Sequence, residues 1–456
     1  MAKTVLVINA GSSSIKYQLV DLDSSEAIAS GIVEAIGEPT DGHYKHEHNG
    51  EKHEFTEPIP DHRTGLKRVL GFFDEFGPKL SEAGIIAVGH RIVQGGSVFP
   101  TPALATDETI QQVRDLAPLA PLHNGPEAVG VEVMRGLLPN VPQVMVFDSS
   151  FFFQLPEDVK TYALNKDIAR KYRIQRYGAH GTSHEYVGQH VPELVGKPAE
   201  GFKQIVLHIG NGASASAQIS GKPIETSMGL TPLEGLMMGG RTGDIDPASV
   251  FYLLRNTDMT VDELDDLYNH RSGMTGMTGY GDLRKVHELI AAGDPDAKLA
   301  LDMYVHRIVS YVGAYWVQLG GLDAITFTAG VGENDEDVRS MVCEKLAPFG
   351  VKIDNDINNT RSKQPRVIST PDSSVAVCVL PTNEELAIAR KAEKIAADGD
   401  AYGNVFSKGS EANRSASRRR TPPADARHGL RFCWVPAEHL LRGDPAYSKR
   451  MPMIGH

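Results

Sequence analysis

The sequence predicts an α/β protein with two lobes and a phosphate site between them. An apolar run, a turn of small residues and an alternating strand follow one another in Thr4–Asp21, and Gln204–Ser220 repeats this design in the second half. A third apolar run, in Ala324–Asn334, also leads into glycines. Turns of this kind expose successive backbone N–H groups, which form concavities that bind anions.

The remaining stretches alternate between predicted helices and strands. Apolar residues recur at helical spacing in Asp61–Phe76, Asp107–Leu116 and Asp302–Leu319, and we interpret the aromatic residues of the last segment as core. Short apolar runs that end at polar residues predict buried strands at Ile85–Arg91 and Gln143–Phe147. The coarse pattern is therefore mixed α/β.

Two helix starts are predicted nearer the end of the chain. The third glycine turn leads into a helix that begins near Asp335. The segment Pro381–Ile395 starts with the letters PTNEE, a good capping pattern, and continues as an alanine-rich helix.

The composition changes after residue 397. Gly399–Ala426 is rich in glycine, serine, arginine and proline, and Leu430–Leu441 is more apolar but shows no period. Such a segment buries too little apolar surface to offset its ordering entropy. We therefore expect residues 398–456 to form an atypical, disordered tail, either a fused extension or the product of out-of-frame translation. We interpret the run Arg418–Arg420 as solvated charge rather than a polyanion site.

Length and composition narrow the function classes. A chain of 456 residues exceeds one ordinary core, so two or more domains are expected. The chain has 41% hydrophobic and 23% charged residues, no long apolar stretch and no leader before the first strand. These features predict a cytoplasmic protein without a membrane partner. The net charge of −12 argues against nucleic acid. Cys343, Cys378 and Cys433 are scattered and odd in number, which predicts neither disulfides nor a metal cage.

Nine segments resemble the acetokinase family and occur in that family's order. They are VLVINAGSSSIKYQLVD, GHRIVQGG, APLHNG, VFDSSF, RYGAHGTSH, HIGNGASASA, MGGRTGDIDP, TAGVGEN and PTNEELAIAR, within residues 3–396. The resemblance implies the two-lobed actin-like ATPase fold of sugar kinases, Hsp70 and actin, with duplicated ribonuclease-H-like βββαβαβα domains and the nucleotide in the interlobe cleft. It implies an N-terminal lobe of residues 1–150, completed by 385–397, and a nucleotide-binding C-terminal lobe of residues 151–384.

The family's reaction is the reversible, in-line transfer of the ATP γ-phosphoryl group to acetate, with Mg²⁺, which Mn²⁺ can replace. Because the chain has no GxxxxGK[ST] loop, its glycine turns must cradle the phosphates. By resemblance, the residues that contact ATP or ADP are Ser12, Ser14, Lys16, His208, Ile209, Gly210, Asn211, Gly212, Asp282, Leu283, Arg284, Gly330, Val331, Gly332, Glu333 and Asn334. The alternative for the lysine is an exposed position on an alternating strand.

Magnesium prefers oxygen ligands, keeps several waters and needs only one or two protein groups. Asn9 and Glu384 resemble the family's magnesium-site residues, and Glu385 is the competing candidate. Without the resemblance, Glu384 would be read as a carboxylate favoured at a helix start.

The acceptor is a carboxylate with a pKa of roughly 4 to 5, so it is ionised at pH 7 and needs no general base. Asp148 matches the family's catalytic aspartate, and we expect it to orient acetate and metal or to hold a metal-bound water; proton transfer stays an alternative. Arg91 and Arg241 match the two active-site arginines, whose planar forks suit carboxylate and phosphoryl oxygens. His180 resembles the donor to the equatorial oxygens of the transition state, a role typically worth ~3–4 kcal/mol.

The family's acetate pocket is small and apolar, and Val93, Leu122 and Pro232 match its residues. A phenylalanine of that pocket is replaced here by Ala179. The replacement predicts a larger pocket that accepts longer acids such as propionate. His123 is a second-tier candidate on the substrate side.

Two other features of the segments qualify these assignments. Gln94 stands where the family commonly has histidine, and LHNGP replaces LHNP, so both changes affect the expected substrate affinity more than ATP binding. His184 receives no catalytic role and is expected to cap or pack.

Two rival functions remain open. One is a propionate or other short-chain acyl kinase of the same fold. The other is a non-catalytic actin- or Hsp70-like ATP-binding protein, a class that lacks the paired Arg91 and Arg241 and the histidine at 180. The implied partners are ATP, acetate or another short-chain carboxylate, and a second copy of the chain in a homodimer.

Overall fold

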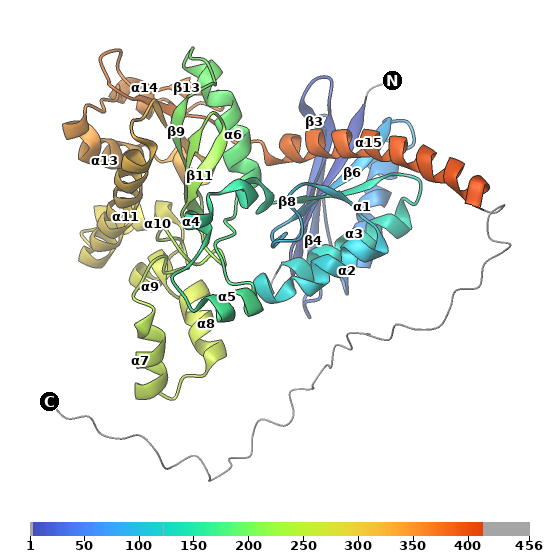
Figure 1. Cartoon of the computed structure of the whole chain (residues 1–456), viewed down its shortest axis with the longest axis horizontal. Helices are drawn as coiled ribbons and strands as arrows, with labels where there is room; N and C mark the ends of the chain where they lie inside the picture. The colour runs from blue at the N-terminus through green and yellow to red at the C-terminus, as the bar shows by residue number, and fades with distance from the viewer. Residues whose placement is uncertain (1–2, 122, 414–456) are drawn as a thin grey trace, which may run out of the picture. The chain divides into compact units, whose positions relative to one another are not determined.

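The first of two sheets occupies the N-terminal part of the chain (Figure 1). The computed structural model describes residues 3–121 and 123–413. Within these described residues, the first sheet has eight strands in the order β5-β4-β3-β2-β1-β6-β8-β7. They are β1 (Thr4–Ala10), β2 (Ser14–Asp21), β3 (Glu26–Glu34), β4 (Gly42–His48), β5 (Glu51–Glu57), β6 (Ile85–Ile92), β7 (Ala103–Leu104) and β8 (Gln143–Phe147). β1, β6 and β8 run parallel, and β2 to β5 extend the sheet antiparallel.

The second sheet repeats the beginning of the first. Its order in the described chain is β11-β10-β9-β12-β14-β13. The strands are β9 (Lys203–Ile209), β10 (Ala213–Ile219), β11 (Lys222–Thr226), β12 (Ala324–Thr328), β13 (Arg366–Val367) and β14 (Ala376–Val379). Each sheet contains an antiparallel hairpin, β1–β2 or β9–β10, whose first strand pairs in parallel with a later strand, β6 or β12. The internal repeat and the mixed α/β class predicted from the sequence are confirmed.

Helices cover both faces of the first sheet because successive strand residues point to opposite sides. They are α1 (His62–Phe76), α2 (Asp107–Asp115), α3 (Asn124–Leu137) and α15 (Glu384–Asn413). Leu6 and Ile8 of β1 pack with α1 and α3, whereas Val5 and Val7 pack with α15. Gly89 of β6 allows α15 to approach, since a Cβ there would lie 2.8 Å from Ile388.

The second sheet is also covered on both faces. The longest helix on one face is α11 (Pro295–Leu319), whose Tyr304 and Ile308 belong to the largest core. On the other face, Val187 of α6 (Gly181–Leu194) packs with Val206. The helices of this part of the chain are α4 (Glu157–Lys160), α5 (Lys166–Tyr172), α6 (Gly181–Leu194), α7 (Ala248–Asn256), α8 (Val261–His270), α9 (Gly273–Thr278), α10 (Leu283–Ala291), α11, α12 (Ala329–Asn334), α13 (Glu336–Leu346) and α14 (Asn355–Asn359).

Two predicted helix starts, near Asp335 and at Glu384, are confirmed, whereas one predicted turn and one helix boundary were wrong. The third glycine turn is itself the short helix α12, and Asp335 caps the next helix by accepting a hydrogen bond from the backbone N–H of Val338. α11 begins before residue 302 because Asp294 caps it at Pro295. α15 begins at Glu384, as expected for the last helix, and the side chain of Asn383 before it accepts a hydrogen bond from the backbone N–H of Leu386.

The end of the chain also differs from the expected tail. α15 continues past residue 397 to Asn413, and residues 414–456, with the predicted arginine run, lie outside the described residues. Within residues 3–121 and 123–413, none of the helices combines the length and hydropathy that crossing a membrane requires. Cys343 and Cys378 are buried and form no disulfide, and Cys433 is not among the described residues.

Candidate active site

An arginine and an aspartate meet at the ends of two neighbouring parallel strands. Arg91 lies near the end of β6, Asp148 follows β8, and the backbone N–H of Asp148 donates to the carbonyl of Ile92. The Arg91 Nε and Nη2 atoms donate to the same oxygen, Asp148 Oδ2, at 3.0 and 2.6 Å. Although burial lowers the pKa of Arg91, the charges of Asp148 and Glu384 raise it above its ordinary value, so Arg91 carries its positive charge.

The second oxygen of Asp148 is held by α6. Thr182 Oγ1 donates to Asp148 Oδ1 at 2.9 Å, and the backbone N–H of Gly181 donates to the Asp148 carbonyl at 3.0 Å. A Cβ at residue 181 would lie 2.0 Å from that carbonyl oxygen, so only glycine permits the approach. Asp148 is therefore fixed through both carboxylate oxygens and its backbone, with 1% of its surface exposed.

His180 stands at the start of α6 in the left-handed backbone region, with φ 58°. Its Nδ1 lies 2.9 Å from Ser214 Oγ, and its ring stacks on His208 with centroids 4.2 Å apart. Burial, followed by the repulsion from His208 and His184, holds the pKa of His180 well below its usual range. Burial also lowers the pKa of His208 to about 4. Both rings are neutral at pH 7.

Gly212 separates His180 from Arg241. A Cβ at this glycine would lie 3.5 Å from His180 Nε2 and 3.6 Å from Arg241 Nη1, so both groups flank the turn between β9 and β10. Arg241 Nη1 donates to the carbonyl of Pro232 at 3.3 Å and lies 3.7 Å from Met238 Sδ. Among the described residues Arg241 has no carboxylate within 4.0 Å, in contrast to Arg91. It is a half-buried cation whose charge is available to an incoming anion.

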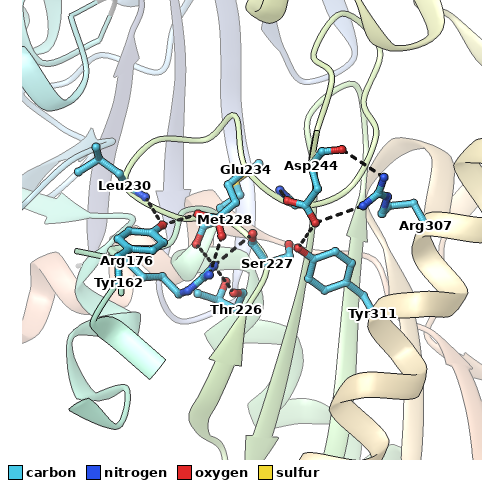
Figure 2. A network of polar contacts seen from close by, with 11 residues as sticks. Tyr162, Arg176, Thr226, Ser227, Met228, Leu230, Glu234, Asp244, Arg307 and Tyr311 are labelled. Carbon is cyan, nitrogen blue, oxygen red and sulfur yellow. Dashed lines mark hydrogen bonds and ion pairs between the residues drawn. The ribbon is translucent and has the colours of Figure 1, made fainter. Parts of the chain in front are cut away.

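A polar network fixes the first part of the loop that carries Pro232 and Arg241 (Figure 2). Arg176 Nη2 donates to Glu234 Oε1 at 2.6 Å, and Tyr162 donates to the other oxygen of Glu234. The Tyr162 hydroxyl accepts the backbone N–H of Leu230 at 3.0 Å, and Arg176 Nη1 donates to the carbonyl of Thr226 at 3.0 Å. Three side chains from separate segments therefore hold residues 226–234.

A second network holds the far end of the same loop (Figure 2). Asp244 Oδ1 accepts the backbone N–H of Gly235 at 2.8 Å, which closes the loop on itself. Asp244 Oδ2 accepts from the hydroxyl of Tyr311 at 2.7 Å, and Arg307 Nη2 donates to the Asp244 carbonyl at 3.1 Å. Because Tyr311 and Arg307 belong to α11, the loop with Arg241 is anchored to the core of the second sheet.

Val93 and His123, two of the predicted acid-binding residues, lie near Arg91. The backbone N–H of Val93 donates to Glu127 Oε2 at 3.0 Å, and Asn124 exchanges hydrogen bonds with the backbone of Gln94. Burial raises the pKa of Glu127 to about 8. His123 precedes α3, and burial followed by the charges of two arginines lowers its pKa, which places it near both.

Arg91 and Arg241 are the two arginines that act on His123. Ala179 is 4% exposed, directly before His180. Leu122 lies outside the described residues.

Several predicted nucleotide contacts line one pocket of about 280 Å³ on the second sheet. The predicted residues in its wall are Gly210, Asn211, Asp282, Leu283 and Val331. Gly239 also lines this pocket, and a Cβ there would lie 1.9 Å from Asn211 Oδ1, so a larger residue would displace the Asn211 side chain.

Other predicted nucleotide residues lie outside this pocket wall or have internal partners. Glu333 Oε1 accepts the backbone N–H groups of Ala329 and Thr382, at 2.8 and 3.2 Å, and so ties α12 to the start of α15. Asn334 donates to the carbonyl of Gly330 within α12. Arg284 is exposed and pairs with Asp282. The remaining predicted residues of the second sheet are His208 and Ile209, which end β9, Gly212 in the turn, and Gly332, which is buried in α12.

The first-sheet candidates form a turn and a strand. The turn between β1 and β2 is closed by the N–H of Gly11, which donates to the Ser14 carbonyl at 2.7 Å, and Ser12 is exposed in it. Lys16 pairs with Asn9 across the two strands. Both line a pocket of about 230 Å³ together with Glu385.

The oxygen donors expected for magnesium lie around this pocket and Arg91. Glu384 Oε2 is 3.9 Å from Arg91 Nε, and burial together with the nearby Asp148 and Glu385 raises the pKa of Glu384 to about 7, despite the opposing charge of Arg91. In the described part of the chain no three His, Cys, Asp or Glu side chains are grouped to hold a metal ion. Amide and carboxylate oxygens from Asn9 and Glu384 still suit Mg²⁺, which keeps several of its waters.

Several residues that hold the predicted site residues in place were not predicted from the sequence. Thr182 lies in a segment that the family resemblance had marked, but it received no role. Ser214, which contacts His180, lies on an alternating strand whose polar positions were a visible signal. Arg176 and Glu234 are far apart in the sequence and carry no local signal for their pairing.

An arginine without a carboxylate partner in residues 3–121 and 123–413, a neutral histidine and a glycine turn lie together near the pocket of the second sheet, which is the arrangement expected of a phosphotransferase. The sequence matches the Acetokinase family model over residues 4–390. The chain belongs to this family.

Individual relatives agree with this assignment. The acetate kinase of Clavibacter michiganensis subsp. michiganensis is 51% identical over 387 residues, which cover 85% of this chain and 98% of that protein. The crystal structure of the Porphyromonas gingivalis acetate kinase shows 41% identity and a TM-score of 0.82, covering 86% of this chain and all of that one. A propionate kinase from Francisella tularensis shows 35% identity and a TM-score of 0.81 over 86% of this chain and all of its own. The chain therefore has the fold of these acetate and propionate kinases.

Proposed function

We propose that this protein transfers the γ-phosphoryl group of ATP to acetate, reversibly and in line, to give acetyl phosphate and ADP. The observation that carries the proposal is Arg241, whose guanidinium flanks Gly212 opposite His180 and has no carboxylate partner among the described residues. A guanidinium fork whose charge is not neutralised by a carboxylate of the described residues suits two anions that must approach each other.

The acceptor needs orientation rather than deprotonation, because acetate is ionised at pH 7. Asp148 has both oxygens engaged, by Arg91 and by Thr182, and is therefore better suited to orienting groups than to removing a proton. The Nη1 atom of Arg91 takes no part in these two hydrogen bonds, so its N–H groups can donate to the carboxylate of the acid. The backbone of Val93, held by Glu127, provides one wall of the acid pocket.

His180 supplies a neutral donor to the phosphoryl group in transit. A neutral imidazole donates through one nitrogen only. Since Nδ1 is occupied by Ser214, the donor is Nε2, which lies beside Gly212 and Arg241. Donors of this kind, fixed before the reaction, are typically worth about 3–4 kcal/mol each in the transition state.

The nucleotide is assigned to the pocket of the second sheet and to the two glycine turns. The residues with this role are Ser12, Ser14, Lys16, His208, Ile209, Gly210, Asn211, Gly212, Asp282, Leu283, Arg284, Gly330, Val331, Gly332, Glu333 and Asn334. Asn9 and Glu384 would hold the Mg²⁺, which neutralises phosphate charge when bound. We also assign to this chain a cytoplasmic location and a homodimeric state, as the family resemblance implies.

One observation favours propionate as a second substrate. Ala179 is buried directly before His180, at a position where the sequence resemblance places a phenylalanine of the acid pocket. A missing ring leaves room for additional methylenes, each of which gains about 0.8 kcal/mol when buried.

The test is ATP-dependent acyl phosphate formation, trapped as the hydroxamate, with acetate, propionate and butyrate in parallel. Product from acetate that Arg241→Ala abolishes supports the proposal, and the propionate-to-acetate ratio reports on Ala179. A protein that binds ATP but gives no product from any acid would overturn it.

A further inference from the structure

A chain of buried hydrogen bonds runs from the interior of the second sheet to His180. Three polar side chains alternate along β10, and all three are fully buried: Ser214, Ser216 and Gln218. Their strand neighbours Ala213, Ala215 and Ala217 face the opposite core. A fully buried His184, one turn after His180 on α6, bridges the two serines.

The direction of the hydrogen bonds is fixed at the far end of this hydrogen-bond chain, where Gln204 and Gln218 lie. Gln204 Nε2 donates to the carbonyl of Gly188 at 2.8 Å and lies 3.4 Å from Gln218 Oε1, while Gln218 Nε2 donates to the carbonyl of His184 at 3.0 Å. A backbone carbonyl only accepts, so these contacts determine which end of each amide is the NH₂ group. The second proton of Gln218 Nε2 then points to Ser216 Oγ, 3.1 Å away.

The polarity propagates from this amide to the active site. Ser216 Oγ accepts from Gln218, so its own proton goes to His184 Nδ1 at 2.8 Å. His184 is then protonated on Nε2 and donates to Ser214 Oγ at 2.7 Å. The Ser214 hydroxyl in turn donates to His180 Nδ1 at 2.9 Å.

The opposite polarity leaves a proton without an acceptor. If His180 donated from Nδ1, each bond of the chain would reverse and His184 Nδ1 would donate to Ser216. The Ser216 hydroxyl proton would then have no acceptor among the described residues, although the side chain is fully buried. A buried unsatisfied donor is unfavourable, so the first polarity is preferred.

We propose that the chain Gln218–Ser216–His184–Ser214 fixes His180 as the neutral tautomer protonated on Nε2, so that a donor faces Gly212 and Arg241 before any substrate binds. The four residues are positioning residues that act through His180, and the purpose of the tautomer rests on the proposed function. Burial also lowers the pKa of His184 and His180, which agrees with two neutral rings. The sequence predicts only a capping or packing role for His184. In the structure both of its ring nitrogens make hydrogen bonds within this chain of residues.

The first test measures the tautomers in the whole wild-type protein. In a sample with ¹⁵N-labelled histidine, two-bond ¹H–¹⁵N correlation spectra distinguish Nε2–H, Nδ1–H and imidazolium rings, and His180→Gln and His184→Gln assign the signals. We expect both rings as Nε2–H at pH 7. An Nδ1–H tautomer or an imidazolium at His180 would overturn the proposal, whether or not the protein turns out to be an acetate kinase.

The second test uses variants that interrupt the hydrogen-bond chain. Ser214→Ala and Ser216→Ala should lower kcat by about 10–100-fold, as loss of an orienting partner typically does, while KM for ATP and for the acid stays within about twofold. Thr326→Val is the matched control, because it removes a fully buried hydroxyl from β12 of the same sheet, outside the hydrogen-bond chain and outside the loop that carries Arg241. Unchanged kcat in both serine variants, with the control also unchanged, would contradict the proposal.

Discussion

Glu127 is a carboxyl group whose burial should make the stability of the protein depend on pH. It is 2% exposed on α3, and its Oε2 accepts the backbone N–H of Val93. Burial raises its pKa to about 8, against 4.5 for an ordinary glutamate. Glu127→Gln keeps an oxygen for the N–H of Val93 but cannot ionise, so the comparison isolates the charge.

The sign and size of the effect follow from proton linkage. A raised native pKa gives stability that is fully present below about pH 4.5 and is lost as the pH rises toward 8, because the unfolded chain ionises first. The slope is about 1.4 kcal/mol per pH unit, so wild type should lose roughly 3–4 kcal/mol relative to Glu127→Gln between pH 5 and pH 8. Other titrating groups largely cancel in this difference.

The assay is urea-induced unfolding of both proteins at several values between pH 5 and pH 9. We expect the difference in unfolding free energy to shift steadily in favour of Glu127→Gln as the pH rises and to level off above pH 8. A difference that stays constant over this range would show that Glu127 is ionised in the native state at low pH and would refute the reasoning.

Three further perturbations test neighbouring features. Arg91→Ala leaves the buried side chain of Asp148 without its partner and should lower the free energy of unfolding in urea by about 3 kcal/mol. Adding Asp148→Asn in a double variant should restore part of this loss. If the effects of the two substitutions simply add, the pairing is contradicted. A chain ended at residue 402 should keep wild-type kcat and Tm, and a loss of either would give the tail a role. Ala179→Phe should lower the propionate-to-acetate ratio of kcat/KM by about fourfold per methylene excluded, and an unchanged ratio would remove Ala179 from the acid pocket.

Much of the fold was predictable because it depends on local patterns. The two hairpins and the strands Ile85–Arg91 and Gln143–Phe147 follow from apolar runs and turn residues, and the structure confirms them with small shifts at their ends. Since the last two strands are parallel neighbours, the polar residues at their ends meet, which brings Arg91 to Asp148.

The features that were missed depend on contacts between distant segments. Arg176 and Glu234 lie 58 positions apart, and nothing near either residue indicates that they pair beneath the loop of Arg241. The alternating serines of β10 were visible, but an alternating strand normally predicts a solvated face. Only the structure shows that α6 covers this face and that His184 lies between Ser214 and Ser216.

The most direct test of the central claim follows the oxygen atoms of the acid. Acetate labelled with ¹⁸O in both carboxylate positions is incubated with ATP, Mg²⁺ and the protein, and the acetyl phosphate is examined by ³¹P NMR. If a carboxylate oxygen attacks the γ-phosphorus, every product molecule carries one ¹⁸O in the bridge between carbon and phosphorus, and the phosphorus signal shifts accordingly. Acetyl phosphate without the isotope shift, or no acetyl phosphate while Mg²⁺ and ATP are bound, would contradict the account.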